Sequence, residues 1–209
     1  MRRTLSIIKL IRCAVTEGQK ESFSQGQSVW SELKGCDGFE GQCGGWSEDG
    51  EALVLGQWRS KKHVSAFMES VHDALALKSH QQRTYRYCDV HYFEKVKNIQ
   101  PIVDNVIQPN RSFIHLTLYR QIQHVNRFTH DILNTENPEP KASDGMLGGF
   151  LARGISADDC FLVATFWRSY SHFKGDRRIT PCRIRGAEQS GNVSEWRVNE
   201  EAAWKVSPL

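Results

Sequence analysis

The chain has 209 residues, enough for one large domain or for two of about 100 residues each. Hydrophobic residues make up 39% of it and charged residues 24%, which is ordinary for a soluble globular protein. The net charge of +3 is too small to indicate nucleic-acid binding, and no apolar run approaches the length of a membrane span, so neither nucleic acid nor membrane is expected as a partner.

The first half of the sequence predicts the order strand, helix, strand, strand, helix, strand. Apolar residues at helical spacing mark the two helices, and the second of these is the clearest amphipathic helix in the chain. The middle strands predict a hairpin because Asp49-Gly50 lies between them. In chain order, the predicted elements are residues 5–15, 18–34, 39–46, 52–59, 61–78 and 85–95.

The second half predicts much of the same order. Its strands are predicted at residues 112–119, 145–152 and 159–167, with a last strand within 193–206. A helix is predicted at 121–134. The second helix of this half is predicted to be short because Pro181 follows soon after it.

Two short motifs recur in both halves and in the same order, which predicts a duplication. Residues 41–46, Gly-Gln-Cys-Gly-Gly-Trp, parallel residues 145–150, Gly-Met-Leu-Gly-Gly-Phe; the Trp-Arg-Ser of residues 58–60, followed by His63, parallels the Trp-Arg-Ser of residues 167–169, followed by His172. The shared position of the two histidines indicates common ancestry or packing at the start of a helix.

The predicted fold class is α+β, with tandem ferredoxin-like βαββαβ units that form an intramolecular dimeric α/β-barrel-like assembly. The first unit is predicted at residues 1–97, a linker at 98–111, and a second, eroded copy at 112–209. Strand 159–167 is apolar on both faces, so helices are expected to cover one face and the sheet of the other half the second. Such pairing predicts a monomer with an internal pseudo-dimer.

The six cysteines form no Cys-x-x-Cys pair, so neither a zinc site nor a thioredoxin-type site is predicted. Their spread along the chain predicts buried thiols in a reducing compartment. Lys9 and Arg12 interrupt the apolar run near the N-terminus, so no signal peptide is expected. The predicted location is therefore cytoplasmic.

The first half resembles the YdbC-like family of uncharacterised bacterial proteins over about residues 7–95. The resemblance rests on Ile11-Arg12-Cys13, on residues 38–46 with Gly-Phe-Glu-Gly-Gln and Gly-Gly-Trp, on Trp58, on Phe67-Met68 and on His72-Asp73. That family is similar to the dimeric α/β-barrel superfamily, which includes antibiotic-biosynthesis monooxygenases and haem-degrading oxygenases. The resemblance implies paired ferredoxin-like sheets, and it leaves the reaction open.

The resemblance also allows a residue-by-residue comparison with the haem-degrading relatives. Those proteins use an Asn on the first strand, a Trp in the second helix and a His about ten residues later. Here the two helical positions carry Phe67 and Leu77, and no Asn occurs in residues 1–97. In the second half the same offsets reach Asp176 and Gly186. The haem-degradation residues are therefore missing from both halves.

His72 is the residue for which we predict a ligand-binding or proton-transfer role. Projected on the helix, it lies at the margin of the apolar face, whereas Asp73 is expected to point to solvent. His72 could thus line the edge of a pocket, and the alternative is a half-buried histidine at the edge of the core. The dipeptide recurs as His130-Asp131, which we interpret as coincidence.

Five further residues are candidates for ligand binding. Arg12 and His115 lie on the first strand of each half among apolar neighbours, so each needs a partner, either a hydrogen bond between the halves or the polar end of a ligand pocket. The other candidates are aromatic and could equally serve core packing: Trp46, Trp58 and Phe67. No metal site and no cofactor are predicted, and no catalytic residue can be assigned.

Two hypotheses for function follow. The first is a small-molecule-binding α/β-barrel protein that could act as a cofactor-independent, monooxygenase-like enzyme on an organic substrate. In this hypothesis Arg12 and His72 are polar contacts of an apolar ligand. The alternative is a non-catalytic module for ligand sensing or structural interaction. A connected cavity that reaches His72 would favour the first hypothesis.

Overall fold

A computed structural model of the chain describes residues 6–99, 111–136, 145–175, 188 and 190–209. Its contacts divide these residues into two compact units. The first unit comprises the described residues up to Tyr92 together with Val198–Leu209, and the second comprises the described residues from Phe93 to Arg197. The compact units therefore interleave along the chain, and the sequence-based boundaries 1–97 and 112–209 stay a prediction.

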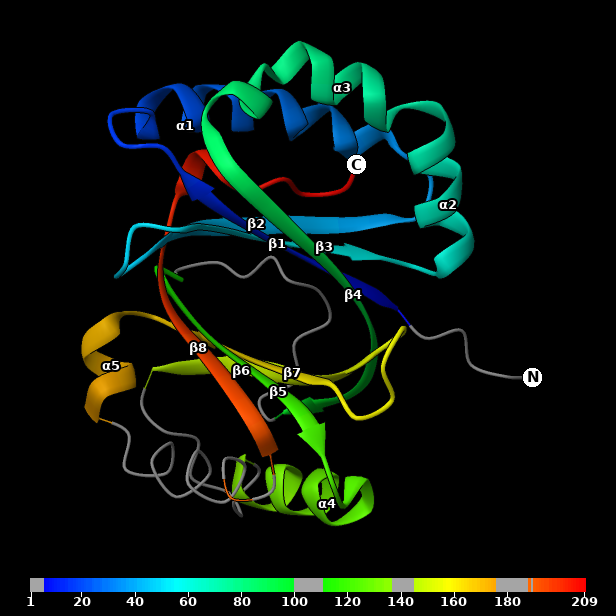
Figure 1. The fold of residues 1–209 in the computed structure, drawn as a ribbon, viewed down its shortest axis with the longest axis vertical. Coiled ribbons are helices and arrows are strands. Elements are labelled where there is room, and N and C mark those ends of the chain that lie inside the picture. Colours follow the sequence, from blue (N-terminus) through cyan, green and yellow to red (C-terminus); the bar gives the residue numbers. More distant parts are fainter. Residues whose placement is uncertain (1–5, 100–110, 137–144, 176–187, 189) are drawn as a thin grey trace. The chain divides into compact units, whose positions relative to one another are not determined.

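The first unit has the strand order of a ferredoxin-like fold, β4-β1-β3-β2, and its paired strands are antiparallel. Helices α1, α2 and α3 lie over one face of this sheet (Figure 1). The elements are β1 (Ile7–Val15), α1 (Lys20–Ser28), a 3-10 helix (Val29–Gly35), β2 (Phe39–Ser47), β3 (Ala52–Trp58), α2 (Lys61–Ser70), α3 (His72–Ser79), a 3-10 turn (Gln81–Arg83) and β4 (Tyr85–Ile99).

The second unit repeats this order with the strands β8-β5-β7-β6. Its elements are β5 (Phe113–Ile122), α4 (Val125–Glu136), β6 (Met146–Gly154), β7 (Phe161–Trp167), α5 (Tyr170–Gly175) and β8 (Ser190–Glu200), followed by a 3-10 turn (Ala202–Trp204). The α+β class with two tandem ferredoxin-like units is thus confirmed. The pairing of the two sheets into a barrel stays a prediction.

Strands β4 and β8 each contribute to both units. β4 begins in the first unit, and its residues Phe93–Ile99 pair with β6 in the second. β8 begins in the second unit, and its last residues, Val198–Glu200, pair with Ser47–Gly45 of β2 in the first. β4 also extends to Ile99, so a strand occupies the first two residues of the predicted linker; residues 100–110 lie outside the described part of the chain.

The core of each unit contains one strand whose side chains are all buried, β3 in the first unit and β7 in the second. These strands consist mainly of Leu, Val, Ala and aromatic residues, as expected for strands covered on both faces. In the second unit, Trp167, Phe128 and Phe161 belong to one buried cluster. In the first unit, Phe23 and Trp204 pack together at 5.6 Å between ring centroids, so residues late in the chain complete this core.

The helix predicted at residues 61–78 is broken. α2 ends at Ser70 and α3 begins at His72, because Val71 has a φ of −117°, outside the usual helical range. Sequence periodicity did not reveal the break, since the apolar side chains of Val64, Phe67, Val71 and Leu75 keep helical spacing across it. The last strand of the second half also starts earlier than predicted, at Ser190, and ends at Glu200.

The structure corrects the register of one predicted repeat. Phe39 and Met146 pair with Trp58 and Trp167, respectively, and a bulge follows each of them at Gly41 and Gly148. Residues 38–41 therefore correspond to residues 145–148. The sequence alignment paired residue 145 with residue 41, so it is shifted by three residues from the structural alignment. Both segments contain several glycines, so glycine matches glycine in either alignment. Only the structural alignment places a glycine at each bulge.

The second repeat is confirmed as a local motif at the start of α2 and α5. Ser60 Oγ lies 2.7 Å from His63 Nδ1, and Ser169 Oγ lies 2.7 Å from His172 Nδ1. Each histidine ring packs against a glycine with positive φ, Gly38 (+72°) or Gly145 (+102°). The shared histidines thus serve helix-start packing, one of the two alternatives that the sequence left open.

Substitution of Gly38 by Ala is expected to destabilise the first unit by about 2 kcal/mol. A Cβ atom at Gly38 would lie 2.2 Å from Cγ of His63, and positive φ adds strain. Chemical denaturation would measure the loss. Gly18→Ala is the matched control because Gly18 also has positive φ (+75°) but no atom near its Cβ. Equal losses of stability in Gly38→Ala and Gly18→Ala would contradict a role for the His63 contact. Adding His63→Ala should restore part of the stability that Gly38→Ala loses.

Candidate ligand cavity

A cavity of about 240 Å³ lies within the first unit, between its sheet and its helices. Strands β1, β3 and β4 contribute residues to its floor, and the helices contribute residues to its roof. Most of its wall is apolar and aromatic, and the side chains that define it include Phe23, Trp30, Phe39, Val54, Trp58 and Phe67. The volume exceeds the roughly 150 Å³ of an engineered cavity that binds benzene, so a molecule with one or two aromatic rings fits by size.

Lys9 is a charged residue that lines this apolar cavity. It lies on β1 opposite Gly56 of β3, and only 8% of it is exposed. Its Nζ atom lies 4.0 Å from Sδ of Met68 and 5.9 and 5.8 Å from the ring centroids of Phe67 and Tyr92. Among the described residues no carboxylate lies within ion-pair distance of this ammonium group.

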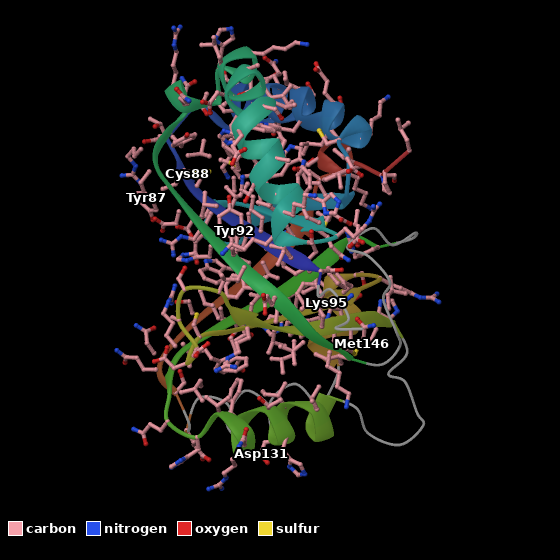
Figure 2. The ribbon with its side chains drawn as sticks, turned by 90° about the vertical axis from the view of Figure 1, so that its right-hand side faces the viewer. Tyr87, Cys88, Tyr92, Lys95, Asp131 and Met146 are labelled. Atoms are coloured by element: carbon pink, nitrogen blue, oxygen red, sulfur yellow. A yellow bond between two sulfur atoms is a disulfide. The ribbon has the colours of Figure 1, made fainter. Side chains whose placement is uncertain are left out.

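Burial lowers the pKa of Lys9 from 10.5 to about 8, because an apolar surrounding disfavours the charged form. Tyr92, on the neighbouring strand β4, is affected in the opposite direction: burial raises the pKa of its hydroxyl group. Tyr92 lies on β4 with Tyr87 and Cys88 (Figure 2). A lysine with a pKa near 8 can both bind an anion and exchange a proton close to neutral pH.

His72 borders the cavity at the start of α3. Its ring centroid lies 5.6 Å from that of Phe67, in an edge-to-face arrangement, and 5.8 Å from that of Trp30. The side chain is 25% exposed, so it lies at the rim. The prediction that His72 lines a pocket edge therefore agrees with its position, and its functional role stays a prediction.

Asp73 points to solvent, as the sequence predicts, and it also contacts His72. Nδ1 of His72 lies 2.9 Å from Oδ1 of Asp73, and Asp73 is otherwise exposed to solvent. Both residues begin α3, where the Asp73 carboxylate can orient the imidazole ring. His130 and Asp131 make a similar contact, at 3.5 Å, within the continuous helix α4.

A buried group of amides forms another part of the cavity wall. Gln81 donates hydrogen bonds from Nε2 to the carbonyl oxygen of Phe23 (2.9 Å) and to Oε1 of Gln27 (3.0 Å). Its Oε1 accepts a hydrogen bond from Nε1 of Trp30 (2.7 Å). Because these groups satisfy one another, the network fixes Trp30 and Gln27 at the cavity without leaving a buried polar atom of Gln81 unbonded.

A disulfide between Cys13 of β1 and Cys88 of β4 also lines the cavity. The prediction that all cysteines are thiols is therefore wrong for this pair. Three described cysteines are free, namely Cys36, Cys43 and Cys160, and Cys182 lies outside the described residues. The predicted reducing compartment does not fit this bond, because disulfides are rare in the cytosol of most organisms. The cytoplasmic location stays a prediction.

Three of the predicted ligand-binding residues line the cavity: Trp58, Phe67 and His72. Trp58 and Phe67 stack at 4.9 Å between ring centroids. Their position is consistent with the ligand-binding role that the sequence suggested, although each is also part of the buried core.

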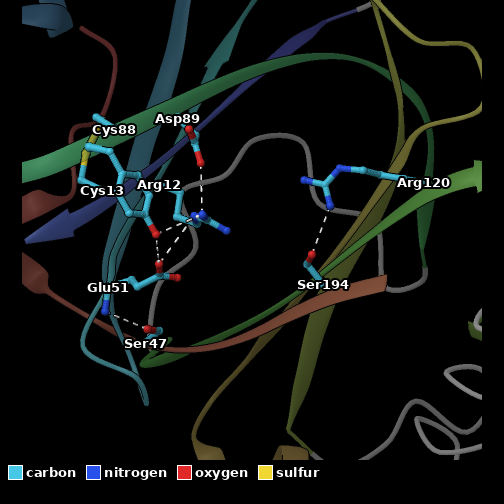
Figure 3. Close-up of polar contacts among 9 residues, drawn as sticks. Arg12, Cys13, Ser47, Glu51, Cys88, Asp89, Arg120 and Ser194 are labelled. Atoms are coloured by element: carbon cyan, nitrogen blue, oxygen red, sulfur yellow. Dashed lines mark hydrogen bonds and ion pairs between the residues drawn. A yellow bond between two sulfur atoms is a disulfide. The ribbon is translucent and has the colours of Figure 1, made fainter. Parts of the chain in front are cut away.

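Arg12 does not line the cavity, so the structure does not bring it together with His72. Side chains alternate along a strand, and Lys9, Ile11 and Cys13 take the cavity face of β1. Arg12 instead contacts Asp89 (3.1 Å), Glu51 (3.6 Å) and the hydroxyl group of Tyr87 (3.2 Å), all in the first unit (Figure 3). A hydrogen bond from Arg12 to the other half stays a prediction.

Trp46 and His115 also lie outside the cavity lining. Trp46 packs against Trp204 at 5.2 Å and against Phe23 at 5.7 Å, so its described contacts are those of core packing. His115, in the second unit, is 4% exposed, and its Nε2 atom lies 3.1 Å from Oε1 of Glu195 on β8. Figure 3 shows another polar contact of the second unit, a hydrogen bond of 3.1 Å from Arg120 to Ser194.

Sequence reasoning missed Lys9 as a site residue. In the sequence this lysine served only to exclude a signal peptide. The available signal was a lone lysine two residues from Ile7 and Ile11, within a strand that is otherwise apolar on that face. Its orientation toward the helices could not be read from the strand alone.

The described residues contain no cluster of three or more His, Cys, Asp or Glu side chains that could hold a metal ion. Within the same part of the chain, no helix is long and apolar enough to cross a membrane. The cavity offers one buried amine, one imidazole at the rim and a wall of aromatic rings.

The fold and this cavity define a ferredoxin-like α+β protein with room for a small organic molecule. Residues 7–93 match the model of a family described as a domain of unknown function, DUF4937. A comparison with curated proteins gave no significant match in sequence.

Several solved structures share the fold over nearly the whole chain. A candidate monooxygenase from Lactobacillus acidophilus NCFM has a TM-score of 0.72 at 8% identity, covering 97% of this chain and 96% of that one. A candidate monooxygenase from Fusobacterium nucleatum subsp. nucleatum ATCC 25586 has a TM-score of 0.73 at 9% identity, with coverages of 96% and 94%. An anthrone oxidase-like protein has a TM-score of 0.66 at 10% identity, with coverages of 94% and 91%. At such identities the likeness shows the fold alone.

Proposed function

We propose that the first unit binds a small aromatic molecule in the cavity between its sheet and its helices. The cavity itself carries the proposal, because it combines about 240 Å³ of space with an aromatic wall and a few polar groups. Ligand sites usually have this composition, with apolar residues providing contact area and polar groups fixing orientation.

We further propose that the chain acts on its ligand as a monooxygenase-like enzyme without a cofactor. The names of the two candidate monooxygenases and of the anthrone oxidase-like protein support this step by analogy of fold. In such a reaction the organic substrate supplies the electrons. For example, 1,4-naphthohydroquinone and O2 would give 2-hydroxy-1,4-naphthoquinone and water.

We also propose that the first half is related to the YdbC-like family and that the chain is a monomer.

Cinnamyl alcohol, a neutral aromatic probe, is expected to bind and to change the tryptophan fluorescence, because Trp30 and Trp58 line the cavity. His72→Ala should weaken this binding several-fold while costing about 1 kcal/mol of stability or less, since His72 lies at the rim. Titration by fluorescence and thermal unfolding would measure the two effects.

His130→Ala is the matched control, because His130 also precedes an aspartate on a helix surface and lies in the other unit. Unchanged binding in His72→Ala would remove the case for His72. Failure of both this neutral probe and an anionic aromatic probe to bind the wild-type chain would contradict the cavity as a ligand site.

Catalysis is tested separately, by oxygen consumption with 1,4-naphthohydroquinone. An enzyme of the proposed class should consume O2 faster than the uncatalysed oxidation and place one atom of 18O2 in the product. Binding of aromatic probes without accelerated oxygen uptake would favour the alternative, a non-catalytic ligand-sensing or structural interaction module.

A further inference from the structure

The cavity contains a buried cation that no described carboxylate neutralises. Lys9 lines the cavity and is 92% buried, as its exposed fraction is 8%. The atoms around it are a thioether sulfur and the faces of two aromatic rings, those of Phe67 and Tyr92. Arg12, on the opposite face of β1, differs from Lys9, because it contacts two carboxylates.

An ammonium group in such surroundings is poorly solvated. Moving it out of water costs several kcal/mol unless an anion or several hydrogen bonds replace the lost water. Contacts of the ammonium group with aromatic faces offset part of this desolvation cost, typically about 0.5–2 kcal/mol each. An anionic oxygen beside Nζ would offset much more of the desolvation cost, because a charge-assisted hydrogen bond in an apolar surrounding is strong.

We propose that the cavity selects an aromatic ligand that carries a carboxylate group, and that Lys9 binds this carboxylate. The inference rests on the proposed ligand site and names the chemical class that the site prefers. The stacked rings of Trp58 and Phe67 provide the surface for the aromatic part of the ligand, and Lys9 lies next to Phe67. The carboxylate end of the ligand is therefore expected at Lys9, and its aromatic part along the other apolar side chains of the wall, such as Phe23 and Val54.

Few other titratable groups face Lys9. From β4, Tyr92 contacts it directly, and Tyr85 lines the same cavity; from α3, His72 lies at the rim. Cys13 and Cys88 do not titrate, since they form a disulfide. Because burial raises the pKa of Tyr92, this group stays neutral over the range in which Lys9 changes charge.

Binding of cinnamate and of cinnamyl alcohol to the full-length chain tests the proposal, since the two probes differ mainly in charge. At pH 7 cinnamate should bind about tenfold or more tightly than the alcohol, the factor expected for one charge-assisted hydrogen bond. In Lys9→Met the ratio of the two affinities should fall to near one. In Lys62→Met, which removes an exposed lysine of α2, the ratio should stay as in the wild type.

The pH dependence gives a second readout that a purely structural role of Lys9 would not produce. Cinnamate stays ionised above pH 6, whereas Lys9 loses its proton with a pKa of about 8 in the free protein. Above that pH its affinity for cinnamate should fall by up to about tenfold per pH unit. Lys9→Arg should keep the preference for cinnamate but lose this pH dependence, because arginine stays charged.

Three outcomes are distinguishable. A preference for cinnamate that disappears in Lys9→Met and loses its pH dependence in Lys9→Arg supports the proposal. Equal binding of both probes to the wild type, or an undiminished preference in Lys9→Met, overturns it while leaving the ligand site intact. Binding of neither probe overturns both the proposal and the proposed function.

Discussion

Loss of the Cys13–Cys88 disulfide is expected to lower the free energy of unfolding by about 4 kcal/mol. The bond joins residues separated by 75 positions, so it restricts a long loop of the unfolded chain. Both cysteines border the cavity, where β1 and β4 are neighbours in the sheet. A loss of this size corresponds to a decrease in melting temperature of roughly 10 °C for a chain of this length.

Denaturant unfolding of the wild type with and without a reductant would measure this loss. The double variant Cys13→Ala/Cys88→Ala should show the lower stability in both conditions, and Cys36→Ala, which removes a free thiol, should behave as the wild type. Thiol titration of the unfolded protein should reveal two additional thiols after reduction. A stability of the wild type that does not respond to the reductant would contradict the prediction.

Lys9→Met is expected to stabilise the first unit by up to roughly 3 kcal/mol at pH 7. The burial that lowers the pKa of Lys9 to about 8 disfavours its charged form in the folded state. This penalty is present in full below pH 8, because the ammonium is then charged in both states. It decreases as the pH rises toward the unfolded value of 10.5, since the folded state releases the proton first.

The difference in stability between Lys9→Met and the wild type should therefore be largest at neutral pH and shrink between pH 8 and 10.5. Urea unfolding across this range would measure it. Comparison of the two proteins cancels the effect of the other groups that titrate at high pH, and Lys62→Met reports the effect of removing an exposed charge. A difference that is constant with pH would show that Lys9 is not a buried, desolvated amine.

Much of the fold could be predicted because its strands are apolar and separated by clear turns. The hairpin of β2 and β3 follows from Asp49-Gly50, where Gly50 has a φ of +79°. The break at Val71 could not be predicted, since an apolar residue at helical spacing carries no sign of a changed backbone angle. The repeat register failed for a similar reason, as glycines give little side-chain information.

The candidate site was predicted in part. Aromatic residues such as Trp58, at the end of β3, and Phe67, within α2, were found because large apolar side chains mark the interior. Lys9 was missed because its role depends on which face of β1 the helices cover. The disulfide could have been found by combining two predictions: a ferredoxin-like strand order places β1 beside β4, and Cys13 and Cys88 lie on these two strands.

The interleaving of the two units has a consequence for protein synthesis. A ribosome releases residues 6–92 long before it adds Trp204, which is 1% exposed and packs on Phe23 and Trp46. At typical translation rates this interval is on the order of ten seconds. Throughout it, the nascent first unit lacks both the β8 segment that pairs with β2 and the indole that covers Phe23. This apolar surface is therefore accessible to chaperones and to other nascent chains until residues 198–209 arrive.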